Sequence, residues 1–352
     1  MDIEQLMAYA VQQKSSDLHL SSGMPPLMRI HGELQTMDLP PLSADCITTL
    51  LHDLLNENQK IHLSENLEID FSFTTSNLAR VRINVFYQSR GIAAVFRIIP
   101  DIIPTIEDLN LPPVIEEMTQ CPNGLVLVTG PTGSGKSTTL AAIINQINSS
   151  RPLHVLTIED PIEFVHVSKK SLITQREVHH HTLSFHSALR AALREDPDVI
   201  MLGELRDLET IRLALTAAET GHLVIATLHT SSAVKAISRI IDVFPAEEKS
   251  MVRSQLSESL QLVIAQKLVR TINPGRVAVV EILRCTSAIR NLIREDKLPQ
   301  IYSAMQTGQV YGMQTLEQHL MKLVAEKTIS IQNALEVTVN KGLLEKVNAK
   351  TF

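Results

Sequence analysis

The stretch GLVLVTGPTGSGKSTTLAAII occupies residues 124–144 of the chain. Its first six residues form an apolar run typical of a buried strand, and residues 137–144 can continue as a helix. Between them, GPTGSGKS at residues 130–137 matches the pattern G-x-x-x-x-G-K-[ST] at every position. A chance glycine-rich turn is the alternative, and a full match between a strand and a helix argues against it. We therefore predict a binding site for a nucleoside triphosphate.

The chemistry of this loop explains its composition. Its glycines allow tight turns that direct backbone N–H groups inward, and the following helix N-terminus adds to an anion site. The lysine supplies positive charge for the β- and γ-phosphates, and the Ser137 hydroxyl is placed to hold Mg²⁺. The predicted cofactors are ATP and Mg²⁺. The predicted ATP-binding residues of the loop are Gly130, Pro131, Thr132, Gly133, Ser134, Gly135, Lys136, Ser137 and Thr138.

The bulk properties restrict the class of protein. A chain of 352 residues, 44% hydrophobic and 20% charged, is expected to form about two domains with ordinary cores. A net charge of -6, no Trp and only 3% aromatic residues argue against nucleic acid as a partner. The three separated cysteines predict neither a disulfide framework nor a metal cluster, and fit a reducing compartment. The start lacks a signal-peptide layout, and no apolar run reaches about 18 residues, so we expect a cytoplasmic protein without direct membrane insertion.

Residues 1–99 predict a small α+β domain with an antiparallel sheet. The proline-rich residues 100–113 predict a linker, and residues 114–352 follow as the second domain. In the first domain we expect helices at 3–13 and 43–54 and strands at 17–20, 27–30, 67–73, 79–87 and 91–99.

Arginines share one face of two of these strands. Positions 81, 83 and 85 are apolar and alternate with Arg80 and Arg82, so the two sets face opposite sides of the sheet. The next strand adds Arg97. A solvated sheet face is the ordinary interpretation of such arginines. The alternative is that they reach phosphates bound by a neighbouring subunit.

Beyond the loop, strands at 154–158, 199–202 and 223–228 alternate with helices at 184–194 and 208–219. This order predicts a parallel, RecA-like α/β sheet. Glu163, Glu204 and His229 each follow one of the strands, where such sheets bind ligands. Glu163 could orient or deprotonate the attacking water, Glu204 could hold the Mg²⁺ shell and His229 could sense the γ-phosphate. Ion pairs in loops are the alternative, and which carboxylate is the base stays open.

The histidines invite a metal-site interpretation. His222 and His229 flank one strand and are therefore about 23 Å apart, too far to chelate one ion. The run at His179, His180 and His181 lies in a polar loop and is interpreted as a solvated turn. Mg²⁺ is the metal we predict.

Several motifs together resemble those of a known family. TIEDPIEFVH (157–166), LREDPDVIMLGELRDLETIRLALTAAETGH (193–222) and TLHT (227–230) look like the Asp box, Walker B and His box of secretion-superfamily ATPases. AIRNLIRE at 288–295, DLHLSSGMPP at 17–26 and the arginine strands resemble the type IV pilus retraction ATPases. The resemblance covers nearly the whole chain.

The resemblance implies a RecA-like P-loop motor domain with a PAS-like N-terminal domain. It implies a homohexamer that binds ATP at subunit interfaces and drives pilus depolymerisation and twitching motility. It also implies an inner-membrane pilus platform protein and a paralogous retraction ATPase as partners, at the cytoplasmic base of the pilus. By matching motif, Glu163 is the catalytic glutamate, Glu204 the Walker B glutamate, Arg82 and Arg97 reach nucleotide across the interface, and His222 and His229 form the His-box pair.

The AIRNLIRE segment also has a pattern of its own. Positions 289, 292 and 293 form an apolar helical stripe, typical of a core helix. Arg290 and Arg294 lie four apart on another face, and we expect Glu295 and Asp296 to neutralise them. The resemblance implies that this helix serves retraction rather than nucleotide binding.

Three other functions compete with a retraction ATPase. Pilus or type II secretion assembly ATPases usually have a longer N-terminal region and paired CxxC motifs for zinc, which this chain lacks. A DNA-translocating ATPase is disfavoured by the acidic balance and scarce aromatics. An idle regulatory subunit is disfavoured by the intact Lys136, Glu163 and Glu204. The direction of pilus movement follows from the resemblance alone.

Overall fold

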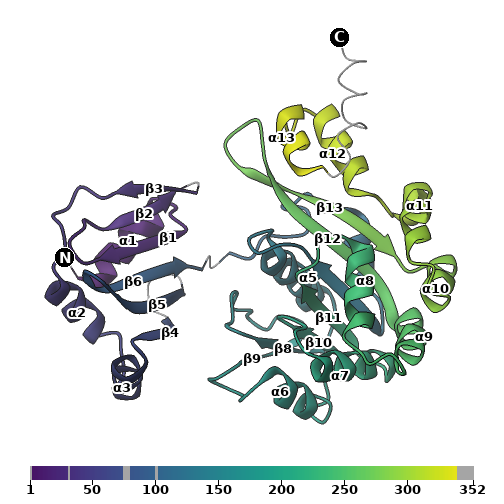
Figure 1. The fold of residues 1–352 in the computed structure, drawn as a ribbon, viewed down its shortest axis with the longest axis horizontal. Coiled ribbons are helices and arrows are strands. Elements are labelled where there is room, and N and C mark those ends of the chain that lie inside the picture. The colour runs from purple at the N-terminus through teal and green to yellow at the C-terminus, as the bar shows by residue number, and fades with distance from the viewer. Residues whose placement is uncertain (1, 31, 74–79, 100–101, 339–352) are drawn as a thin grey trace. The chain divides into compact units, whose positions relative to one another are not determined.

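The computed structural model describes residues 2–30, 32–73, 80–99 and 102–338 (Figure 1). The chain divides into two compact units, Met1–Ile102 and Ile103–Phe352. Ala79, the first residue of one predicted strand, lies outside the described residues.

The first unit is built on a six-stranded antiparallel sheet, as the sequence predicts, in the order β3-β2-β1-β6-β5-β4. Three helices accompany the sheet. The strands are β1 (Asp17–Ser21), β2 (Leu27–Ile30), β3 (Glu33–Thr36), β4 (Glu68–Phe73), β5 (Val81–Gln88) and β6 (Gly91–Ile98). The helices are α1 (Ile3–Gln12), α2 (Ala44–His52) and α3 (Glu57–Asn66).

Two elements of this unit escaped the sequence analysis for the same reason, the lack of a regular apolar pattern. All four residues of β3 are exposed, so no alternation marks the strand. Helix α3 buries only Leu63, and its other large apolar residue, Ile61, is exposed. The elements with a buried face were predicted correctly: Val81 and Ile83 are almost fully buried, and the Ser43 side chain accepts a hydrogen bond from the Cys46 N–H at the start of α2.

The second unit contains a seven-stranded sheet in the order β13-β12-β7-β11-β10-β8-β9. Every neighbouring pair is parallel except β12 and β13, so the predicted parallel sheet is confirmed with one antiparallel edge strand. The strands are β7 (Gly124–Thr129), β8 (His154–Glu159), β9 (Leu172–Glu177), β10 (Val199–Leu202), β11 (Leu223–Leu228), β12 (Leu260–Arg270) and β13 (Arg276–Arg284).

Helices cover both faces of this sheet (Figure 1). The alternating residues of β7 show the two layers: Leu125 and Leu127 join one apolar cluster, and Val126 and Val128 join the other. Strands buried on both faces are apolar almost throughout, which is why β7, β8, β10 and β11 were predictable from the sequence. The helices are α4 (Pro113–Met118), α5 (Lys136–Ser150), α6 (Phe185–Ala192), α7 (Leu208–Glu219), α8 (Ala233–Asp242), α9 (Lys249–Ser259), α10 (Ser287–Arg294), α11 (Pro299–Thr307), α12 (Leu316–Ala325) and α13 (Ile331–Val337).

The second half of the proline-rich segment packs on the second unit. Ile106 and Leu111 are buried in the same apolar cluster as α5. The Asp108 carboxylate accepts hydrogen bonds from the N–H and hydroxyl of Thr105, which closes a turn. In the described ranges of the chain, no helix has both the length and the apolar character needed to cross a membrane.

Candidate nucleotide site

The glycine-rich loop joins the end of β7 to the start of α5. Gly130, Gly133 and Gly135 have φ values of +152°, +77° and +87°, a region that side chains with a Cβ avoid. The Ser134 N–H donates to the Pro131 carbonyl at 3.2 Å, which closes the turn. The backbone therefore adopts the conformation that the glycine spacing predicts.

The loop has the features of a phosphate cradle. A Cβ built on Gly133 would meet nothing within 4 Å, so one side of the loop is open. The Ser134 hydroxyl is buried and has no hydrogen-bond partner within the described residues. An open concave backbone, an orphaned hydroxyl and a helix N-terminus fit a bound polyphosphate.

Lys136 brings the loop and two of the predicted acidic residues together. Its ammonium donates to the carbonyls of Gly130 at 3.0 Å and Pro131 at 3.1 Å. Burial lowers the pKa of Lys136, and the nearby charges of Glu204 and Glu163 oppose that shift. Both carboxylates thus act on the lysine that is predicted to contact the phosphates.

Glu204 and His229 follow the adjacent parallel strands β10 and β11 and meet at the carboxyl edge of the sheet. The His229 Nε2 lies 3.3 Å from Glu204 Oε1, and the Arg206 Nε donates to Glu204 Oε2 at 2.7 Å. The sequence predicts Glu204 and His229 as site residues but not their contact with each other, and no pattern marks Arg206. The carboxylate is therefore held from two sides beside the phosphate loop.

A buried carboxyl that we had not singled out, Glu159, supports the loop of Glu163. Its Oε1 accepts hydrogen bonds from the Thr157 hydroxyl at 2.7 Å and from Gln175 at 3.1 Å, and its Oε2 accepts from the Glu163 N–H at 3.4 Å. Burial raises the pKa of Glu159 to about 7. Glu163 itself is exposed. The sequence does place Glu159 at the end of a strand. Its burial depends on tertiary contacts, including the one with Gln175 of β9.

The segment TLHT is tied to the end of β7. The Thr230 N–H donates to the Thr129 hydroxyl at 2.9 Å, and the same hydroxyl lies 2.7 Å from the Thr230 hydroxyl. Thr129 immediately precedes the glycine loop. His229 is thus fixed relative to the loop by its neighbour in sequence.

Arg82 and Arg97 lie directly opposite each other on β5 and β6 of the first unit. Arg82 makes three hydrogen bonds to Asp70, at 3.0 Å, 3.2 Å and 2.6 Å, and the Arg97 Nε donates to Asp17 at 3.0 Å. Like charges facing each other across strands repel, so each needs a counter-ion. The sequence analysis missed both carboxylates, because each comes from a different strand.

Comparisons with known proteins agree with this geometry. Residues 1–274 match the family described as Type II/IV secretion system protein. This chain belongs to that family.

Its relatives within the secretion family include pilus motors. The type IV pilus retraction ATPase PilT of Pseudomonas aeruginosa is 59% identical over 96% of this chain and 98% of its own length. A twitching motility protein of Neisseria gonorrhoeae is 57% identical over 88% of this chain and 83% of its own. The crystal structure of the pilus retraction motor PilT with bound ADP matches with a TM-score of 0.92 and 46% identity, over 98% of this chain and 99% of that one. The predicted RecA-like fold class is confirmed.

His222, one residue of the His-box pair of this secretion-family protein, lies away from the glycine loop of its own chain. His222 precedes β11, and its carbonyl accepts from the N–H of Gly124 at 3.0 Å, at the start of β7. Its Nδ1 lies 3.0 Å from the Ala217 carbonyl. The glycine loop begins at the other end of β7. The structure does not bring His222 to the loop of its own chain, and its predicted part in nucleotide binding stays a prediction.

The triple histidine forms a turn after β9. The His181 Nδ1 accepts from the Glu177 N–H at 2.9 Å, and His180 lies 3.5 Å from the Glu177 carboxylate. Across the residues that the structure describes, no group of three or more His, Cys, Asp or Glu side chains is placed to hold a metal ion.

The AIRNLIRE segment forms α10, as predicted, with Ile289 and Ile293 fully buried. The prediction that Glu295 and Asp296 neutralise Arg290 is wrong. Arg290 instead donates to the carbonyls of residues 257 and 258 at the end of α9. Glu295 pairs with a lysine and Asp296 with an arginine of α9, because those cations lie nearer.

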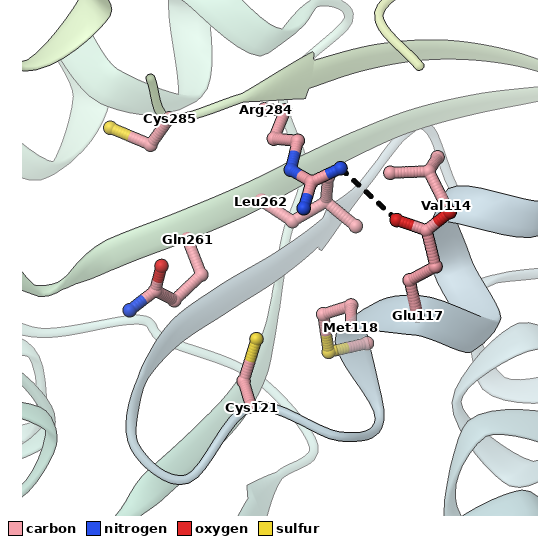
Figure 2. A pocket seen from close by; sticks show the side chains of 8 residues that line it. All are labelled: Val114, Glu117, Met118, Cys121, Gln261, Leu262, Arg284 and Cys285. Carbon is pink, nitrogen blue, oxygen red and sulfur yellow. Dashed lines mark hydrogen bonds and ion pairs between the residues drawn. The ribbon is translucent and has the colours of Figure 1, made fainter. Parts of the chain in front are cut away.

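A cavity of about 80 Å³ lies apart from the nucleotide loop, between α4 and the strands β12 and β13 (Figure 2). Arg284 and Glu117 form an ion pair of 3.1 Å at its wall. Cys121 and Cys285 also line it, and burial raises the pKa of both thiols, to about 11 for Cys285. It contains none of the predicted site residues.

Proposed function

We propose that this chain is an ATPase that powers retraction of the type IV pilus and so drives twitching motility. The observation that carries the proposal is 59% identity to PilT along 96% of the chain, together with a complete phosphate loop. We further propose a homohexamer that binds ATP between adjoining subunits and acts at the cytoplasmic base of the pilus. Its partners would be an inner-membrane platform protein and a paralogous motor, because a type IV pilus ATPase named PilU is also 39% identical.

Different groups at the loop would bind the phosphates and the Mg²⁺ ion. The loop N–H groups and the Lys136 ammonium hold the phosphates, and the carbonyls that Lys136 now contacts compete weakly for it. The Ser137 hydroxyl and, through its hydration shell, Glu204 would hold Mg²⁺, which would neutralise phosphate charge. His229 contacts Glu204 and would report the state of the phosphates to the segment that follows β11.

Between the two neighbouring glutamates, we propose Glu163 as the residue that orients or deprotonates water. Its side chain is exposed, and its charge reaches Lys136. The oxygens of Glu159 already accept three hydrogen bonds and are buried. A carboxylate that is enclosed in this way can hold the loop in place but has little freedom to approach water.

Arg82 and Arg97 are proposed to stabilise developing charge on a phosphate held by an adjoining subunit. They are direct partners on neighbouring strands, so both project from the same face of the sheet, which suits several phosphate oxygens at once. Asp70 and Asp17 then serve to keep them extended and oriented.

Deletion of the gene in its host, followed by electron microscopy and time-resolved imaging of pili, tests the function. Retraction predicts an excess of surface pili that do not shorten, and bald cells would instead show an assembly motor. Complementation with Glu163→Gln is expected to fail. Complementation with Glu107→Gln, an exposed carboxylate outside the site, is the matched control and is expected to restore shortening.

A further inference from the structure

We propose that Gln266 on β12 is a positioning residue for the phosphate loop, setting the direction of a loop N–H that binds phosphate. Gln266 is 3% exposed and lies in a strand that pairs in parallel with β7. Its neighbour Ala265 is the partner of Thr129, so Gln266 lies level with the first residue of the glycine loop. The inference rests on the nucleotide site proposed above.

The side-chain amide of Gln266 bridges the loop and the helix that follows it. Its Nε2 donates to the Ser134 carbonyl at 2.7 Å. Its Oε1 accepts from the Thr139 hydroxyl at 2.8 Å, within the first turns of α5. Both polar atoms of this buried amide therefore form hydrogen bonds, and both bonds are made to the junction between the glycine loop and α5.

The bond to Ser134 fixes the orientation of a peptide unit. The Ser134 carbonyl and the Gly135 N–H belong to the same planar trans peptide, so they point in opposite directions. Because Gln266 draws the carbonyl toward β12, the Gly135 N–H is directed away from β12. Without the amide donor, this peptide unit would lose the contact that sets its direction, since glycine offers little resistance to rotation.

The glycine loop packs closely against both the backbone and the side chain of Gln266. A Cβ built on Gly130 would clash with the Gln266 carbonyl oxygen, and one built on Gly135 would lie 2.8 Å from its Nε2. The loop backbone therefore rests directly on this residue at both of its ends. The need for glycine at 130 and 135 is then partly a consequence of Gln266.

The test uses the purified full chain, a fluorescent ADP analogue and equilibrium titration. Gln266→Glu keeps the shape and the acceptor for Thr139 but removes the donor to Ser134, and Gln266→Met removes both. Gln261→Met is the matched control, because Gln261 lies on the same strand and its amide reaches the Asn123 carbonyl, outside the loop. Unfolding of each variant without nucleotide is followed by circular dichroism.

Both Gln266 variants lose the donor to Ser134, and each is expected to bind the analogue about tenfold more weakly for that reason. The control is expected to bind within about twofold of the wild type, even where its unfolding midpoint falls by a similar amount. If Gln266→Met does not fold, Gln266→Glu decides alone. Wild-type affinity in a folded Gln266→Glu protein would overturn the inference, as would an equal loss of affinity in Gln261→Met. A wild-type chain that does not bind the analogue would instead refute the proposed nucleotide site.

Discussion

Replacing Glu159 by Gln tests how a buried carboxyl at the catalytic edge is held. Burial raises its pKa from 4.5 to about 7, so the folded state binds a proton that the unfolded chain releases between these values. The group therefore contributes stability that is fully present below about pH 4.5 and is lost as the pH rises through about 7. The shift of about 2.5 units, at 1.36 kcal/mol per unit, corresponds to about 3 kcal/mol.

The variant Glu159→Gln cannot ionise, and its amide oxygen can still accept from Thr157 and Gln175. We therefore expect the fall in unfolding free energy between about pH 4 and pH 8 to become smaller by about 3 kcal/mol in the variant. Urea unfolding followed by circular dichroism measures the slope, since the chain has no Trp for fluorescence. Hydrogen exchange of peptides covering residues 155–163 assigns the change to this strand, because the two units need not unfold together.

Glu107→Gln is the matched control, because that carboxylate is exposed and its pH slope is expected to equal that of the wild type. Identical pH slopes for the wild type and Glu159→Gln would refute the reasoning. They would mean that the Glu159 carboxyl has the same pKa in the folded and the unfolded protein. A variant that is less stable at every pH by a constant amount would show that its hydrogen bonds, and not its charge, dominate.

The remaining predictions concern ATP turnover. Lys136→Ala is expected to abolish tight ATP binding, because the phosphates lose their cation; unaltered affinity in a titration would place the site elsewhere. Glu163→Gln is expected to bind ATP and hydrolyse it slowly, and retained turnover in a phosphate-release assay would assign the base to another residue. Arg82→Ala is expected to lose activity by about 10³-fold while keeping the fold of the monomer. If Arg82 acts in trans, mixing this variant with Lys136→Ala subunits changes the activity, and a strictly additive mixture would argue against that.

The parts of the fold that sequence reasoning predicted share one physical property. Strands β7, β8, β10 and β11 are almost entirely buried, so local composition marks them, and the glycine loop after β7 has its own chemical pattern. The predicted helices α6 and α7 begin after Ser184 and Asp207, whose side chains accept N–H groups of the first turn in the structure. For these elements the local pattern and the tertiary environment agree.

The parts that were missed depend on contacts between distant segments. Asp17 contacts Arg97 across 80 positions, and Gln266 contacts Ser134 across 132. Contacts between residues so far apart in the sequence produce no local periodicity from which they could be predicted. Glu159 resembles its neighbours in sequence, and the contacts around this buried group include Gln175 of the neighbouring strand β9, which is mixed in polarity. Long-range pairing was therefore the information that local patterns could not supply.

Helix α10 is anchored away from the phosphate loop. Arg290 places its charge at the C-terminal carbonyls of α9, where the helix dipole favours a cation, and also reaches Gln261. Gln261 in turn contacts the Asn123 carbonyl at the start of β7. The glycine loop leaves the opposite end of this six-residue strand, about 20 Å away. Helix α10 is therefore held at the end of β7 that lies away from the phosphate loop, and its role in retraction stays a prediction.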